Sequence, residues 1–267
     1  MLPQPWRRLK LGIGMNGTKR WRTVGALLVL AAAAVSPANA AELKIFGSRV
    51  TKVIVGELGM QFEKVTGYTP VVVADVAAVM KRRIEAGEPF DLAVLVDFQI
   101  NDLIKSGKLL ADSRADIMSS GIGVAVKRGA PKPDIGTVEA FKHTMLKATS
   151  VTYLKEGAST IHLRKLFAQL GISEAIKSKA VETDGERVSE LVAEGKVELG
   201  LIVIPNIMSV PGAELVGPLP AEINSIVMFT AGISAQSANQ TAARELIKLL
   251  KSLEVRPVIK AKGNDPA

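Results

Sequence analysis

The sequence predicts an α/β fold in which mostly parallel strands carry helices on both faces, and three observations lead to it. Short apolar runs alternate with segments whose apolar residues recur at helical spacing. The apolar runs are nearly continuous, as in strands that are buried on both faces. Glycine follows most of the helical segments, where it commonly ends a helix. This alternation is typical of a parallel sheet between two layers of helices.

Three strand–helix units are expected first, with strands at 43–46, 70–74 and 91–96. Each following helix has one apolar face and ends at a glycine. The first helix has Ile54, Leu58, Phe62 and Val65 on that face and ends at Gly67. The second has Val76, Val79, Met80 and Ile84 and ends at Gly87, and the third has Ile100, Leu103 and Ile104 and ends at Gly107. Asp97 is expected to cap the third helix.

A second group of units follows a strand at 121–127 and the turn-rich segment 128–136, where we place the change of lobe. It is expected to begin with a strand that enters Tyr153 and the helix after it, followed by a polar segment at 183–185 and a helix through Val188, Leu191 and Val192. Strands are expected at 199–204 and 226–233. The last helix has Leu246, Leu249, Leu250 and Leu253 on one face. An irregular connection spans 205–220.

The charge of the chain is concentrated near its start. The formal net charge is +8, from 34 basic and 26 acidic residues. Residues 1–40 hold six of the basic residues and no acidic one, which leaves 28 basic and 26 acidic residues, a net charge of +2. The remainder is therefore not markedly basic, which argues against nucleic-acid binding.

Residues 1–40 resemble a cleavable signal peptide. Lys19, Arg20 and Arg22 precede the apolar run 24–35, and Ala38-Asn39-Ala40 fits an A-x-A cleavage site. Met15 is a candidate for the true start, and cleavage is expected near Ala40–Ala41. The apolar run is short for a membrane span. The chain has no cysteine, which removes disulfides and a lipid-modified cysteine. We expect export to the periplasm.

The segment 153–172 combines a strand end, a loop of small residues and a helix. Leu163, Leu166, Phe167 and Leu170 form one apolar stripe, and Gly157 to Thr160 place small side chains and hydroxyls where the helix begins. A helix start has unpaired N–H donors and a partial positive charge. Either Ser159 or Thr160 caps this helix, or an anion binds to its free donors.

Catalytic motifs are sparse in this sequence. Ser159 and His162 are three residues apart on one helix, but no third partner and no G-x-S-x-G motif accompany them. No spacing suggests a metal site. Arg49 follows the first strand, where a guanidinium either grips a carboxylate or an oxyanion or has only a surface role. We therefore expect a binding protein without enzymatic activity, metal or cofactor.

Several segments resemble the periplasmic solute-binding proteins of ABC importers, most closely the molybdate-binding branch. They are the opening strand with its Gly47-Ser48, the segments 84–92 (IEAGEPFDL), 198–202 (ELGLI) and 216–223 (VGPLPAEI), Asp97 after the third strand, and Leu170-Gly171. The similarity extends over 41–263. It implies the type II periplasmic-binding-protein fold, with two lobes that close over a ligand at the hinge.

The resemblance also implies lobe boundaries and site residues. The first lobe would hold 42–122 and 225–267, and the second 123–224. Oxyanions are held in this family by serine hydroxyls and backbone N–H groups; by position, the corresponding residues here are Gly47, Ser48, Arg49, Val50, Ala77, Ala78, Ser159, Thr160, Gly185 and Val203.

This sequence departs from the family pattern in the oxyanion cradle. The first-loop serine position falls near Val50, the second loop reads Asp75-Val76-Ala77-Ala78 without a hydroxyl, and the position near Val203 lacks a tyrosine. A hydrogen bond to a charged group contributes about 1.5–3 kcal/mol, so the loss of two hydroxyls weakens oxyanion binding by at least about a hundredfold. Arg49 would offset that loss for a different anion.

The prediction is thus a monomeric periplasmic protein that delivers a small ligand, such as a molybdate-like oxyanion, to an inner-membrane ABC permease. The alternative keeps the fold and replaces the oxyanion by an organic acid or another small solute. Two alternatives come from other classes: a secreted hydrolase that uses Ser159 and His162, and the effector domain of a transcription regulator, against which the signal peptide argues.

Overall fold

The computed structural model describes residues 41–183 and 187–267. The expected signal peptide, 1–40, and the predicted site residue Gly185 lie outside the described residues. Their interpretation therefore stays a prediction.

The strands of the described chain are short, apart from β4. They are β1 (Ala41–Gly47), β2 (Tyr68–Ala74), β3 (Leu92–Val96), β4 (Ala115–Lys127), β5 (Val151–Leu154), β6 (Ala180–Thr183), β7 (Leu199–Val203), β8 (Ala213–Pro218), β9 (Ile226–Ile233) and β10 (Asp265–Pro266).

Helices separate most of these strands. They are α1 (Arg49–Thr66), α2 (Ala77–Glu85), α3 (Asp97–Lys105), the 3₁₀ turn η1 (Ala111–Ser113), α4 (Val138–Lys147), α5 (Ala158–Gln169), α6 (Ser173–Lys177), α7 (Val188–Ala193), α8 (Ile204–Met208), α9 (Gln240–Leu250) and α10 (Arg256–Ala261).

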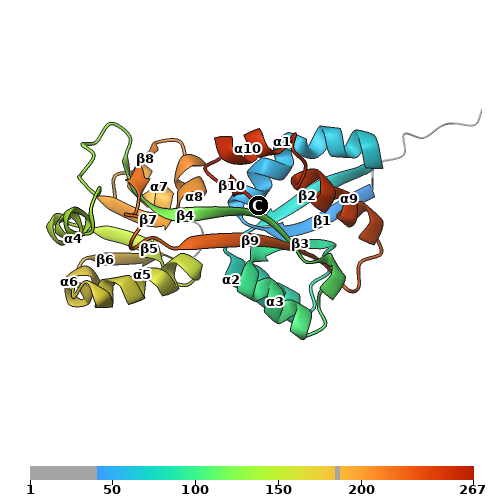
Figure 1. The fold of residues 1–267 in the computed structure, drawn as a ribbon, viewed down its shortest axis with the longest axis horizontal. Coiled ribbons are helices and arrows are strands. Elements are labelled where there is room, and N and C mark those ends of the chain that lie inside the picture. The colour runs from blue at the N-terminus through green and yellow to red at the C-terminus, as the bar shows by residue number, and fades with distance from the viewer. Residues whose placement is uncertain (1–40, 184–186) are drawn as a thin grey trace, which may run out of the picture. The chain divides into compact units, whose positions relative to one another are not determined.

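The strands pair in the order β2-β1-β3-β9-β4-β7-β5-β6, with β8 and β10 attached to β4. Pairing is parallel among β2, β1 and β3, which we call the first section, and among β7, β5 and β6, the second section. β4 and β9 are antiparallel to each other and to their neighbours. Figure 1 shows these two strands running through the middle and joining the sections. The predicted α/β fold is confirmed, although the strands form one mixed sheet with two parallel sections and not two separate sheets.

Helices cover both faces of each section because the strand residues alternate in direction. In β1, Leu43 and Ile45 pack with α1, α9 and α10, whereas Phe46 packs with α2 and α3. In β5, Tyr153 packs with α4, α5 and α6, and Leu154 belongs to the core that α7 shares. The loops that enter α1, α2, α3, α5 and α8 therefore lie at the carboxyl ends of the parallel strands.

Four sequence expectations differ in detail from the structure. The connection 205–220, expected to be irregular, contains most of α8 and all of β8. Val65, expected on the buried face, is 77% exposed in the last turn of α1, beside a surface groove shared with α9. Leu253 is 76% exposed because α9 ends at Leu250. Asp97 is the first residue of α3 rather than its cap, and Val96 takes the N-cap position.

Candidate functional site

Five helices begin at one cavity. Their N-cap residues all line it: Ser48 of α1, Val76 of α2, Val96 of α3, Gly157 of α5 and Val203 of α8. The cavity has a volume of about 60 Å³. The rest of its wall is Ala77, Leu154, Ala158, Ser159, Ile202, Asn206, Val227 and Phe229. We call this space the N-cap cavity.

The convergence follows from how these strands end. β3 passes into α3 and β7 into α8 without an intervening turn, and β1 reaches α1 through Ser48 alone. Ligands of open α/β sheets bind in such strand-to-helix loops. The N–H groups of each first turn have no partner within their helix and carry a partial positive charge. The first turns of α1, α2 and α5 therefore bring backbone donors to the cavity. Pro205 in α8 has no N–H, and Asp97 Oδ1 already accepts the Phe98 N–H of α3.

The cap residues themselves leave most of those donors unsatisfied. Valine is among the poorest N-cap residues because it has no side-chain acceptor. In the described chain, the side chains of Val76, Val96 and Val203 cap none of the N–H groups of their helices, and Gly157 has no side chain that could do so. Of these five N-cap residues, Ser48 alone caps its helix with its side chain, and its Oγ accepts from the Thr51 N–H at 3.4 Å. Poor N-cap residues at several helices that meet at one place are typical of a functional site.

Glycine is required at the start of α5. Gly157 has φ 147° and ψ 172°, a region that is open essentially to glycine alone. This conformation lets the chain leave β5 and begin α5 at the cavity wall.

Four of the predicted site residues lie together in the N-cap cavity: Ser48, Ala77, Ser159 and Val203. Gly47 ends β1 directly before it, and any Cβ there would meet Thr51 at 2.8 Å. Ala78 is the second residue of α2 and is not part of the wall. The hydroxyl of Thr160 is buried and donates to the Leu154 carbonyl at 2.8 Å. Any part that Thr160 takes in ligand binding would thus involve its backbone N–H.

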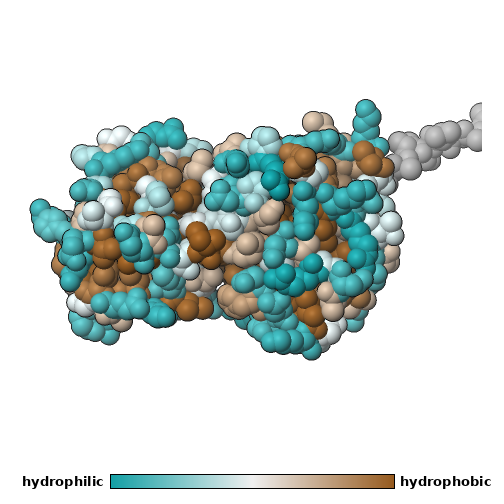
Figure 2. Space-filling view, in the orientation of Figure 1, coloured by the Kyte–Doolittle hydropathy of each residue, from teal (hydrophilic) through white to brown (hydrophobic). Residues whose placement is uncertain are grey.

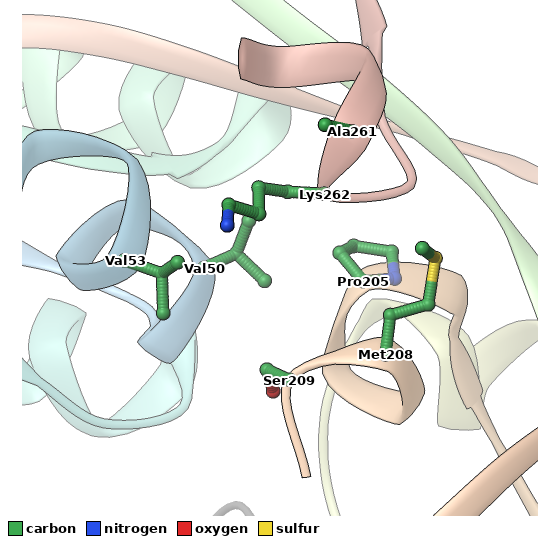
Figure 3. A pocket seen from close by; sticks show the side chains of 7 residues that line it. All are labelled: Val50, Val53, Pro205, Met208, Ser209, Ala261 and Lys262. Atoms are coloured by element: carbon green, nitrogen blue, oxygen red, sulfur yellow. The ribbon is translucent and has the colours of Figure 1, made fainter. Parts of the chain in front are cut away.

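Val50 faces a different cavity, of about 270 Å³. Figure 3 shows Val50 and Val53 of α1 opposite Pro205 and Met208 of α8, with the Lys262 side chain between them. Lys262 is ion-paired with Glu57. No N-cap residue lines this larger space, so we do not place the site there.

Two ion pairs link helices of the first section to elements of the second beside the N-cap cavity. Arg49 pairs with Glu190 of α7. Arg82 of α2 donates to Glu156 Oε1, in the loop before α5, at 2.8 Å. The hydrogen bond from Arg82 lowers the pKa of Glu156, and its partner raises the pKa of Arg82. Arg49 is therefore engaged by a carboxylate of this chain, not held open for an anion.

A second cavity adjoins the N-cap cavity and was missed by sequence reasoning. It measures about 430 Å³ and shares Val96, Ala158 and Val227 with the first. Its ionisable residues are Asp97, His162 and Lys165. We call it the His162 cavity. The spacing of Ala158, His162 and Lys165, four and three residues apart on one helix, was the available signal.

The histidine in this cavity is held by the backbone. His162 Nε2 lies 2.8 Å from the carbonyl oxygen of Ile223. Among the described residues, the hydrogen bond of His162 goes to Ile223 and not to Ser159, so the pairing that a Ser–His hydrolase needs is not formed.

Two further properties concern the described residues alone. In 41–183 and 187–267, no three His, Asp or Glu side chains come close enough to hold a metal ion. Within the same ranges, no helix combines the length and the apolar character that a bilayer span requires.

Comparison with known proteins identifies relatives along nearly the whole chain. The sequence profile described as "Bacterial extracellular solute-binding protein" matches residues 43–264. An aconitate isomerase of a Pseudomonas species is 30% identical over 249 residues, which are 91% of this chain and 95% of that protein. The molybdate-binding protein ModA of Azotobacter vinelandii is 28% identical over 239 residues, 85% of this chain and 90% of that one.

Solved structures agree with this grouping at the level of fold. The sulfate-binding protein SubI of Mycobacterium tuberculosis superposes with a TM-score of 0.70 at 13% identity, covering 85% of this chain and 87% of that one. The type II periplasmic-binding-protein fold that the sequence suggested is therefore confirmed.

The expectation of a protein without enzymatic activity is wrong. A relative at 30% identity over 91% of the chain carries the name of an isomerase. The sequence argument looked for a triad, a nucleophile elbow or a metal cage. An isomerisation by proton transfer needs none of these, only a general base beside a bound substrate.

Proposed function

This chain belongs to the bacterial extracellular solute-binding protein family, and we propose that it binds a small organic polycarboxylate at the N-cap cavity and isomerises it. The observation that carries the proposal is the meeting of five N-cap residues at one cavity, four of them without a side-chain acceptor. Backbone N–H groups at helix starts bind carboxylates as readily as other anions.

The wall of the cavity favours an anion with a carbon skeleton. Besides Ser48, Ser159 and Asn206, its side chains are aliphatic or aromatic, and they include Leu154, Ile202 and Phe229. Apolar walls with a few placed polar groups are usual for organic ligands. A tetrahedral oxyanion has no carbon to pack against such walls.

Aconitate, the substrate in the name of the relative, is a propene that bears three carboxylates. Its double bond can move if one proton leaves the CH₂ carbon and a proton joins the former vinyl carbon. The skeleton is symmetric, so the product is again aconitate, with either cis or trans geometry. The chain must therefore hold carboxylates and supply one base. The N-cap cavity and the adjoining His162 cavity offer these two functions side by side.

Closure of two lobes would enclose the substrate. We take the lobes as 42–122 with 225–267, and 123–224. The pairs Arg49–Glu190 and Arg82–Glu156 support this proposal, because each joins residues of different lobes next to the cavity. Export through the signal peptide and action as a periplasmic monomer complete the proposal.

A second function is favoured by the family profile and by the molybdate-binding relative. The chain would then deliver a small anion to an inner-membrane ABC permease without changing it. Closure around the ligand would be the same. The two functions differ in the ligand and in whether it leaves the cleft altered.

Calorimetric titration separates these two functions. The protein, residues 41–267, is titrated with cis-aconitate, trans-aconitate, a saturated tricarboxylate, molybdate and sulfate. We expect binding of the tricarboxylates and weak or no binding of the two oxyanions. A reversed order, with tight molybdate binding and no heat from any carboxylate, would overturn the proposal and favour oxyanion delivery.

A further inference from the structure

We propose that His162 is the general base of this isomerisation and that Lys165 binds the substrate carboxylate beside it. The inference rests on the proposed function and deepens it. It starts from the position of both side chains in a cavity of about 430 Å³ that shares three wall residues with the N-cap cavity.

One helix, α5, carries the proposed base and also begins at the cavity where we place the substrate carboxylates. Ala158, the first residue of α5, lines both cavities. His162 follows four residues later and Lys165 three after that, so all three lie on one helix face. One turn of helix advances about 5.4 Å. A carboxylate on the first N–H groups of α5 thus places the rest of a short carbon chain alongside His162.

The hydrogen bond of His162 fixes which ring nitrogen acts. The carbonyl of Ile223 can only accept a hydrogen bond, so the Nε2 atom that lies 2.8 Å away carries a proton. In the neutral ring the lone pair is then on Nδ1. The backbone contact holds the tautomer as a carboxylate does in a catalytic dyad, and it leaves Nδ1 free to accept a proton.

The proton transfer balances without a co-reactant. Nδ1 takes a proton from the CH₂ carbon, and the C–H electron pair spreads over the three carbons of the allyl system and the attached carboxylates. The imidazolium then returns a proton to the opposite carbon of the allyl system, and the double bond forms between the other two carbons. The charge of Lys165 stabilises the electron density that reaches its carboxylate.

Apolar side chains at the rim of the His162 cavity would protect a carbanion intermediate from water. Phe98, Ile161 and Ile226 all line the His162 cavity, and they are 43%, 66% and 65% exposed. Figure 2 shows apolar surface on the visible face near the middle of the molecule, at the level of β9. Closure over substrate would bury such side chains and exclude the water that would quench the intermediate.

Asp97 is the other group in this cavity that is able to accept a proton. Its Oδ1 atom already accepts the Phe98 N–H at 2.7 Å. Its negative charge would repel a carboxylate, so we assign the base to His162. The experiment below includes Asp97 as the competing base.

The test measures turnover and affinity of His162→Gln with trans-aconitate, by proton NMR and by calorimetry. His143→Gln is the matched control, because His143 is exposed on α4 and lines neither cavity. We expect His162→Gln to lose at least about a hundredfold in kcat and to change Kd less than threefold. His143→Gln should match the wild type. Lys165→Met should weaken Kd about tenfold.

Retained turnover in His162→Gln would overturn the inference, and loss of turnover in Asp97→Asn beside it would assign the base to Asp97 instead. Failure of the proposed function looks different: the wild type itself would leave trans-aconitate unchanged. Exchange of the substrate CH₂ protons in D₂O gives a second readout, and it should stop in His162→Gln while binding persists.

Discussion

Arg49, in the first turn of α1, forms an ion pair with Glu190 of α7 and so ties the first section of the sheet to the second. The two side chains keep 30% and 27% of their surface exposed. Glu190 Oε2, the other oxygen of the carboxylate, is buried and has no hydrogen-bond partner among the residues that the structure describes. The contact is therefore positioned to hold the lobes together without adding much to the stability of the fold.

Removal of the two interlobe pairs is expected to open the ligand-free protein. A half-exposed pair such as Arg49–Glu190 contributes about 0.2–1 kcal/mol, which changes an open–closed ratio up to about fivefold. Glu190→Gln combined with Glu156→Gln should raise the radius of gyration in solution scattering, and a bound tricarboxylate should reverse the change. Glu85→Gln, which removes a pair inside α2, is the control. An unchanged radius in the double variant would contradict closure by these pairs.

A carboxylate introduced at the start of α2 should stabilise the fold and abolish ligand binding. Ala77 is the first residue of α2 and lines the N-cap cavity. An acidic residue in a first turn stabilises a helix by about 0.3–1 kcal/mol, but it repels an anion bound there. Ala77→Asp should therefore raise Tm and lower affinity at least tenfold, whereas the isosteric Ala77→Asn should bind far better. Equal affinity of the two variants would mean that no anion reaches this helix.

Thr160 is expected to matter for stability and not for affinity. Its buried hydroxyl donates to the Leu154 carbonyl at 2.8 Å. Thr160→Val keeps the shape and leaves that carbonyl without its donor, which should cost about 0.5–1.5 kcal/mol in urea unfolding. The Kd should change less than twofold. A large loss of affinity at unchanged stability would place the hydroxyl in the ligand site instead.

Glu88 should make the fold sensitive to acid. Hydrogen bonds from Arg83 and then from Lys44 hold its pKa at about 2, below the usual 4.5. A carboxylate with a depressed pKa stabilises the fold above pH 4.5, and this contribution is lost as the pH falls from 4.5 towards 2. Glu88→Gln should thus have a lower Tm than the wild type at pH 7, and the difference should shrink towards pH 2. A Tm difference between the two proteins that stays constant from pH 7 to pH 2 would contradict the depressed pKa of Glu88.

The order of strands and helices was predictable because each element carries its own pattern. The apolar stripe of α1 and the glycine after it mark the helix in the sequence, and Gly67 indeed has φ 74° at its C-cap. The antiparallel placement of β9 was not predictable. It depends on pairing with β3 and β4, which lie about a hundred or more residues earlier in the chain, and local pattern carries no such long-range information.

The site was predictable only in part. Ser48, Ala77, Ser159 and Val203 lie in one cavity, and the family resemblance had implied them by position. The sequence could not show that Arg49 pairs with Glu190, because the two residues are far apart in the chain. His162 was noticed beside Ser159, but its partner, Ile223, acts through a backbone carbonyl that no side-chain motif reveals.

The most direct test of the account is a proton NMR time course of trans-aconitate with residues 41–267. We predict that the vinyl signal of trans-aconitate declines while that of cis-aconitate appears, until the same ratio is reached from either isomer. Boiled protein controls for spontaneous conversion. Unchanged spectra of both isomers at equimolar protein, with binding of molybdate in the same sample, would contradict the central claim.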